Sequence, residues 1–178
     1  NAELKKLFSD FEFSSMLGEL EDISEPRVDS PAIENRYETI LTEDDFERWL
    51  QKLQKAKIFA LDLETTSLRP VRAQVVGISF SCEAGEACYI PLTHRYLGVP
   101  EQLQLDWVLN KLKPLLEDPK IKKVGQNIKY DLIVLRNEGI DLQGVAFDTM
   151  LASYILNPSG RRHNMDDLAQ DYLGHTTI

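Results

Sequence analysis

The sequence lacks several features that would place it in a particular class of protein. No apolar run approaches the roughly 18 residues that a membrane-spanning helix requires, and no signal peptide opens the chain, so we expect a cytoplasmic protein. Basic residues are outnumbered, with 20 Lys and Arg against 29 Asp and Glu, and the net charge is −9. Because binding to phosphate groups depends on clustered Lys and Arg, the chain should have no general affinity for nucleic acid.

Cysteine is also scarce. Cys82 and Cys88 are the only two cysteines, too few for the four ligands of a structural zinc site, and we interpret them as reduced packing residues. If the turn between them is a two-residue hairpin loop, Cys82 faces Ala87 and Cys88 faces Ser81. The two thiols would then not form a direct pair.

The 178 residues are enough for one globular domain with an apolar core, and 43% of them are hydrophobic. The first 36 residues are predicted to form an amphipathic helix, over about 2–20, followed by a polar linker with two prolines. After them we expect an edge strand over 37–41, a central strand near 58–66, and strands over 74–82, 86–91, 122–124 and 145–147. The expected helices cover about 43–56, 103–116, 128–136, 149–156 and 165–173.

Polar residues before four of these helices are predicted to be N-caps. They are Thr42, Asn127, Asp148 and Asn164, all of residue types that accept hydrogen bonds from the first turn of a helix. For Asp148, a role as a metal ligand is the alternative to capping.

Two acids follow an apolar run in the central strand. Asp62 and Glu64 are one residue apart, so on a strand both carboxylates point to the same face. Their mutual repulsion is relieved if a hard divalent cation, Mg²⁺ or Mn²⁺, lies between them. A solvated acidic turn at the end of the strand is the simpler interpretation. A third acid, Asp131, lies near the start of a predicted helix after another short apolar strand.

These stretches together resemble a known family. Phe-Ala-Leu-Asp-Leu-Glu-Thr (59–65) and Val-Gly-Gln-Asn-Ile-Lys-Tyr-Asp (124–131) are similar to the first two exonuclease motifs of the family A DNA polymerase proofreading domain. Ala-Phe-Asp-Thr-Met (146–150) and Arg-His-Asn-Met-Asp (162–166) narrow the resemblance to the bacterial DNA polymerase I group. The resemblance implies an α/β, RNase-H-like (DnaQ-like exonuclease) fold, with a five-stranded mixed sheet flanked by helices, over residues 37–178.

The resemblance also implies a two-metal mechanism with Mg²⁺ or Mn²⁺ as cofactors. In this mechanism Asp62 bridges the metals, Glu64 binds the one that holds the attacking water, and Asp131 holds the second. The expected reaction is 3′-5′ exonuclease hydrolysis of the 3′-terminal phosphodiester of single-stranded or frayed DNA, as in proofreading. The expected partners are that 3′ end and a polymerase domain outside this chain, with no obligate protein partner.

Several positions match family contacts to the substrate. By matched motif position these are Thr65, Leu68, Gln126, Asn127, Lys129, Tyr130, Met150 and Arg162. Leu68 resembles an apolar residue that wedges between the last two bases, where stacking tolerates any sequence. Each contact has a simpler alternative, since Thr65 can end a strand, Leu68 can be an ordinary loop residue, and Asn127 can be only a cap.

The chain departs from the family at the third motif, Tyr-x-x-x-Asp. Tyr154 is followed four places on by Pro158, and Tyr172 by Thr176, so neither fits. His163, four residues before Asp167, is similar to a histidine variant, but that variant has a spacing of five. We therefore expect a domain truncated at its C-terminus, ending before this motif.

Two alternatives stay open. One is a catalytically silent module of a family A polymerase that binds a DNA end or spaces other domains, because the third acid motif is absent. The other is an RNA exonuclease like RNase D, which has the same fold and acids.

Overall fold

The computed structural model describes residues 6, 9, 35–159 and 162–176. The amphipathic helix and linker predicted for residues 1–36 lie almost entirely outside this part of the chain. None of the helices in the described residues is both long and apolar enough to cross a membrane.

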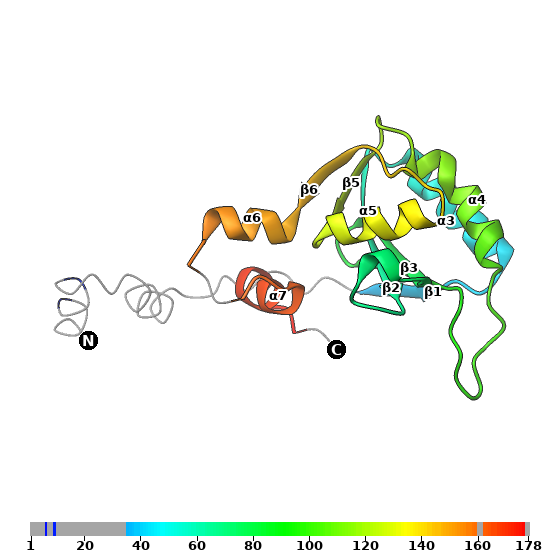
Figure 1. Ribbon diagram of the computed structural model, residues 1–178, viewed down its shortest axis with the longest axis horizontal. Helices are drawn as coiled ribbons and strands as arrows, with labels where there is room; N and C mark the ends of the chain where they lie inside the picture. The colour runs from blue at the N-terminus through cyan, green and yellow to red at the C-terminus, as the bar shows by residue number, and fades with distance from the viewer. Residues whose placement is uncertain (1–5, 7–8, 10–34, 160–161, 177–178) are drawn as a thin grey trace.

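A six-stranded mixed sheet, with strand order β1-β4-β3-β2-β5-β6, forms the centre of the molecule (Figure 1). Strand β2 runs antiparallel to β3 and parallel to β5, and β5 runs parallel to β6. The strands are β1 (Arg36–Thr39), β2 (Ile58–Thr65), β3 (Val75–Glu83), β4 (Glu86–Pro91), β5 (Lys122–Gly125) and β6 (Val145–Asp148).

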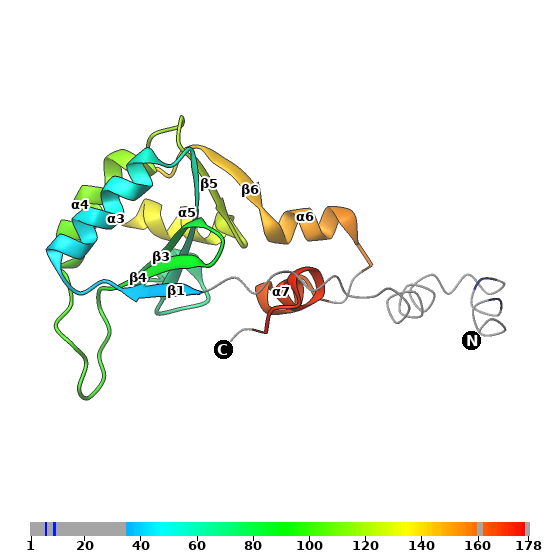
Figure 2. The same ribbon diagram turned by 180° about the vertical axis from the view of Figure 1, so that it is seen from behind.

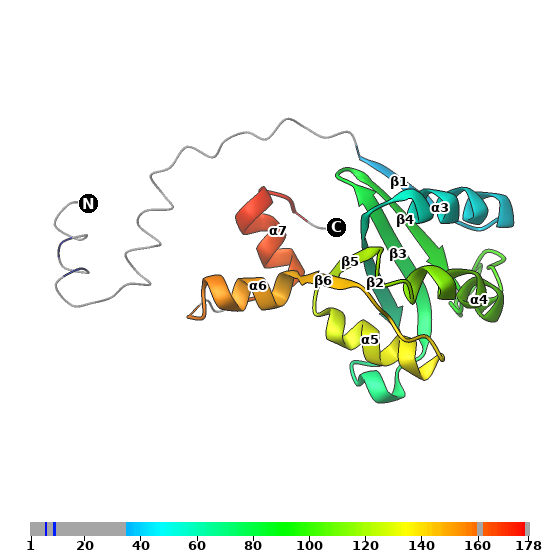
Figure 3. The same ribbon diagram turned by 90° about the horizontal axis from the view of Figure 1, so that it is seen from above.

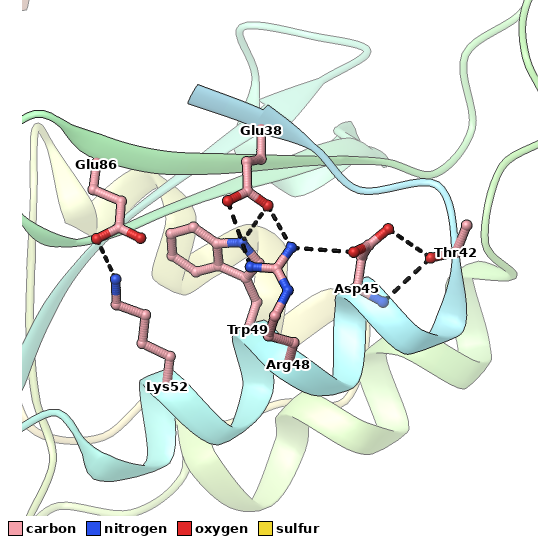
Figure 4. Close-up of polar contacts among 7 residues, drawn as sticks. All are labelled: Glu38, Thr42, Asp45, Arg48, Trp49, Lys52 and Glu86. Atoms are coloured by element: carbon pink, nitrogen blue, oxygen red, sulfur yellow. Dashed lines mark hydrogen bonds and ion pairs between the residues drawn. The ribbon is translucent and has the colours of Figure 1, made fainter. Parts of the chain in front are cut away.

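The predicted five-strand sheet is wrong by one strand. The additional strand is β1, the segment expected as an edge strand, which pairs in parallel with β4 and forms one edge of the sheet. Side chains hold β1 to the helix that follows it (Figure 4). Glu38 accepts hydrogen bonds from Arg48 Nη2 at 2.5 Å and Trp49 Nε1 at 3.2 Å, and Asp45 accepts a further one from Arg48.

Helices α3, α4 and α5 share one apolar core with the sheet (Figures 1 and 2). The apolar sides of α3 and α4 pack on β2, β3 and β4, and the core includes Trp49, Phe59, Phe80 and Leu112. The helices are α3 (Glu43–Lys55), α4 (Leu105–Leu116), α5 (Ile128–Asn137), α6 (Thr149–Leu156) and α7 (Met165–Leu173), with a short 3₁₀ helix, η1 (Pro70–Arg72).

The last two helices extend beyond the edge of the sheet. Helix α6 continues directly from β6, and α7 lies beside α6 (Figure 3). Two predicted N-caps are confirmed here. Thr42 accepts from Asp45 N at the start of α3, and Asn164 accepts from Asp167 N at the start of α7.

The hairpin between β3 and β4 carries the two cysteines. Glu83 faces Glu86 as a two-residue loop requires, but an irregularity then shifts the register, so Cys88 faces Phe80 and not Ser81 as predicted. Both thiols are free, as predicted. Burial raises the pKa of Cys88 to about 12, so this thiol is an inert packing group.

Candidate functional site

The three candidate acids line one cavity of about 500 Å³. The cavity lies between the end of β2, the loop that follows it, and the starts of α5, α6 and α7. Six of the predicted substrate contacts line it as well, namely Thr65, Leu68, Gln126, Asn127, Tyr130 and Met150. Five further lining residues were not predicted to contact the substrate: Leu63, Thr66, Ser67, Asn164 and Met165.

Strand alternation places the first two acids. Leu61 and Leu63 are buried in the core, so Asp62 and Glu64 point to the opposite face, toward the cavity. The pairing between β2 and β3 shifts directly after Glu64, where the strand ends at Thr65. The chain can therefore leave the sheet and form the cavity wall.

The third acid, Asp131, lies in the first turn of α5 and is only 2% exposed. Burial, together with the charge of Asp62, raises its pKa to about 7. The N–H of Leu63 opposes this shift, and the charge of Asp148 adds to it. Burial and the charge of Glu64 likewise raise the pKa of Asp62. The cavity thus disfavours full ionisation of its carboxyl groups unless positive charge is supplied.

A metal ion can bind here only if the carboxyl groups of these acids lie close enough to share it. Within the part of the chain that the structure describes, no three His, Cys, Asp or Glu side chains are close enough together to hold a metal ion as they stand. The chemistry of the donors still fits, since carboxylate oxygens are the preferred ligands of Mg²⁺ and Mn²⁺. Two of the three carboxyl groups also have pKa values raised by burial and by a neighbouring acid, Asp131 by the charge of Asp62 and Asp62 by that of Glu64.

The loop after β2 is fixed by tyrosine. Tyr130 of α5 shares a hydrogen bond of 2.5 Å with Thr65 Oγ1, and it donates another to the carbonyl of Ser67. With the backbone held in this way, Leu68 is left 96% exposed at the cavity. Such a fully exposed leucine contributes nothing to the core.

The start of α5 is capped differently from the prediction. Asn127 occupies the N-cap position with a left-handed φ of 55°, but its side chain makes no capping hydrogen bond. Asp148 supplies the cap from the neighbouring strand: its carboxylate accepts from the N–H groups of Asn127 at 3.1 Å and Ile128 at 3.0 Å.

The same carboxylate also caps α6, as predicted, by accepting from Met150 N at 2.9 Å and Leu151 N at 3.2 Å. Asp148 therefore binds four N–H groups and joins two helices that line the cavity. These bonds favour capping over the alternative role of metal ligand.

Two predicted contacts do not line the cavity. Lys129 is exposed, and Arg162 is exposed and pairs with Asp167 at 3.5 Å. Asp167 also accepts a hydrogen bond from Asn164 Nδ2, and His163 is buried against Ser153. The His163–Asp167 pair is thus used within the fold and is no substitute for the third motif.

A second cavity of about 420 Å³ adjoins the first, since Glu64 and Thr65 line both. Tyr89 lies here over Gly77, where a Cβ would be 2.1 Å from the tyrosine hydroxyl, and it hydrogen-bonds His94 at 2.5 Å. His94 is in a loop, as predicted. Sequence reasoning missed Tyr89 because its contact with Gly77 depends on the pairing of β3 with β4.

A mixed sheet of this strand order, with carboxylates at the end of its central strand, defines an RNase-H-like nuclease fold. The family model described as 3′-5′ exonuclease matches residues 37–178, and the chain belongs to this family. Its catalogued relatives are DNA polymerases I. That of Pseudomonas aeruginosa is 56% identical over 80% of this chain, and that of Rhizobium leguminosarum is 34% identical over 88%.

The chain spans only 16% and 17% of the length of these two relatives. It corresponds to their 3′-5′ exonuclease domain. Three solved structures share the fold. The POL domain of Pol1 from M. smegmatis has a TM-score of 0.62 and 24% identity, and covers 80% of this chain and 23% of its own. E. coli RNase D has a TM-score of 0.56 and 23% identity, and the match covers 80% of this chain and 35% of RNase D. Brucella melitensis NrnC with bound Mg²⁺ has a TM-score of 0.55 and 23% identity, and the match covers 82% of this chain and 64% of NrnC.

Proposed function

We propose that this chain removes nucleotides one at a time from a single-stranded or frayed 3′ end of DNA, as the proofreading domain of a DNA polymerase I. The observation that carries the proposal is the cavity at the end of β2, which Asp62, Glu64 and Asp131 all line. Exonucleases of this family depend on a metal. The raised pKa values of Asp62 and Asp131 support a site that needs a cation, because a bound cation would favour the charged forms.

The metal would be held by these three acids, and we infer two Mg²⁺ or Mn²⁺ ions. Such ions supply an activated water and neutralise the charge on the phosphate. Because the described residues form no complete ligand cluster, the acids must rotate toward the ion, and a fourth acid from the third motif must complete the shell. This chain alone should therefore bind metal weakly.

Substrate binding would use the cavity walls. Leu68 is exposed at the cavity and can insert between the last two bases, while Tyr130 and Met150 offer further contacts. Gln126 and Asn127 present polar groups from the loop before α5. Lys129 and Arg162 lie outside the cavity lining, and their cationic side chains are suited to phosphates farther along the strand.

DNA is the proposed substrate because the relatives with the highest identity given above are DNA polymerases, whereas RNase D shares only 23% identity and the fold. The polymerase domain would lie elsewhere in the parent polypeptide. A role on chromosomal DNA would place the protein in the cytoplasm.

The test compares four substrates labelled at the 3′-terminal nucleotide: single-stranded DNA, a duplex with a mispaired 3′ end, a fully paired duplex, and RNA. Release should be faster from single-stranded and mispaired DNA than from the paired duplex, since the paired end must first be melted. The enzyme is tested as this chain and as a longer polypeptide that includes the third motif. Faster release from RNA would favour an RNase-D-like enzyme, and binding without release by either form would favour the silent module.

A further inference from the structure

One buried residue, His163, lies just before α7 and contacts α6. His163 is 8% exposed, its ring Nδ1 lies 2.7 Å from Ser153 Oγ, and Ser153 is itself only 6% exposed. The ring also stacks on Tyr154, with 3.8 Å between the ring centroids. His163 is thus anchored to α6 by both a hydrogen bond and a ring contact.

The backbone of the same residue reaches the cavity. Its carbonyl accepts a hydrogen bond of 2.7 Å from Gln126 Nε2, and Gln126 Oε1 accepts from the hydroxyl of Thr149. Gln126 lines the cavity from the loop before α5. His163 therefore joins α6, through its ring, to the loop that precedes Asp131.

The residues next to His163 form one wall of the site. Asn164 and Met165 line the cavity. Helices α6 and α7 extend past the edge of the sheet (Figure 3), so the sheet itself does not fix this wall. Its position relative to the acids depends on Asp148 at the start of α6 and on the contacts of His163.

We propose that His163 is a positioning residue that sets the cavity wall formed by Asn164 and Met165 against the acids and so determines how tightly the 3′ end of DNA is held. The inference rests on the proposed function. The acids themselves lie on β2 and α5, outside this wall. Loss of the His163 anchor should therefore weaken binding and leave the hydrolytic step largely unchanged.

The test uses three substitutions of His163. His163→Ala removes the ring, His163→Asn keeps a polar atom near the position of Nδ1 and can still bond Ser153, and His163→Gln places its amide too far out to do so. His175→Ala, at an exposed position in the same C-terminal segment, is the matched control. Dissociation constants for a single-stranded oligonucleotide are measured with Ca²⁺ in place of Mg²⁺, and the single-turnover rate at saturating DNA is measured with the longer polypeptide.

We expect His163→Ala and His163→Gln to raise the dissociation constant about 5- to 10-fold, the loss expected for one hydrogen bond with its contacts. The single-turnover rate should stay within about twofold of wild type, because residues that share no contacts usually affect each other by only a few tenths of a kcal/mol. His163→Asn should restore most of the affinity, and His175→Ala should match wild type. If His163→Ala does not fold, Ser153→Ala removes the same hydrogen bond with the ring retained and should give the same loss.

Three results overturn the inference: unchanged affinity in folded His163→Ala, equal losses in affinity and rate, or identical behaviour of the Asn and Gln variants. These outcomes are distinct from a failure of the proposed function. That failure would show in the wild-type longer polypeptide, as no binding or no hydrolysis at all.

Discussion

At the scale of single residues, burial and charge conflict most at Asp131. Its carboxyl group is almost completely buried, and its pKa is raised to about 7, chiefly by burial. The folded protein therefore holds this proton more tightly than the unfolded chain. The resulting stabilisation is complete below the ordinary pKa of 3.8 and is lost as the pH rises through about 7.

Asp131→Asn should consequently raise the melting temperature of the metal-free protein more at pH 8 than at pH 5. The reason is that the variant never has to ionise a buried group beside Asp62. Thermal unfolding in the presence of a chelator at both pH values measures the effect, with the exposed Glu101→Gln as control. An equal change at the two pH values would show that Asp131 does not titrate in this range.

The carboxylate of Asp148 accepts hydrogen bonds from four backbone N–H groups near the site. Because it caps both α5 and α6, Asp148→Ala should lower the free energy of unfolding by roughly 2 kcal/mol or more, about twice the cost of losing one cap. Asn164→Ala, which removes the cap of α7 alone, is the control and should cost about 1 kcal/mol. Urea denaturation measures both. Equal losses in the two variants would mean that the cap of α5 contributes little.

At the scale of elements, the parts that the sequence predicted are those controlled by local patterns. Alternation of buried leucines with Asp62 and Glu64 identified β2 and the face on which its acids lie. The capping residues Thr42 and Asn164 likewise act within three residues of their own positions.

What the sequence could not predict depends on contacts between distant segments. Asp148 caps α5 only because β6 pairs with β5 and brings Asp148 opposite Gly125, next to the left-handed Asn127. The parallel pairing of β1 with β4 is also a contact between distant segments. The role of His163 depends on Ser153 and Gln126, 10 and 37 residues away. The substrate contacts came from family resemblance, and their roles stay predictions.

Strand β1 offers a test at this scale. Glu38→Ala removes the acceptor of Trp49 Nε1 and of Arg48 and should cost about 1 kcal/mol of stability. Hydrogen bonds from Arg48 and Trp49 lower the pKa of Glu38 in the folded protein. The ionised Glu38 therefore stabilises the fold at pH values above its ordinary pKa of 4.5, and this stabilisation is lost as the pH falls through the lowered pKa.

The loss in Glu38→Ala should therefore shrink in acid. Chemical denaturation at pH 7 and at pH 3 measures this, and Glu47→Ala, which breaks the surface pair with Lys111, is the control. A loss for Glu38→Ala no larger than that of the control would contradict the view that these bonds hold β1 to α3.

At the scale of the whole molecule, a chain with a net charge of −9 must bind a polyanion through its site and not through its surface. In the proposed function, divalent cations held by the three acids would perform this task. Binding to DNA should therefore be weak with a chelator present and should increase when Mg²⁺ or Mn²⁺ is added.

The most direct test of this account is metal-dependent release of the 3′-terminal nucleotide from single-stranded DNA by the longer polypeptide that includes the third motif, with and without Asp62→Ala. We predict release in Mg²⁺ or Mn²⁺, none with a chelator, and a loss of at least about a hundredfold in the variant, the order of effect of removing one charge-stabilising group from an active site. Release that continues in Asp62→Ala, or that never occurs at any metal concentration, would contradict the assignment of these acids as the catalytic centre.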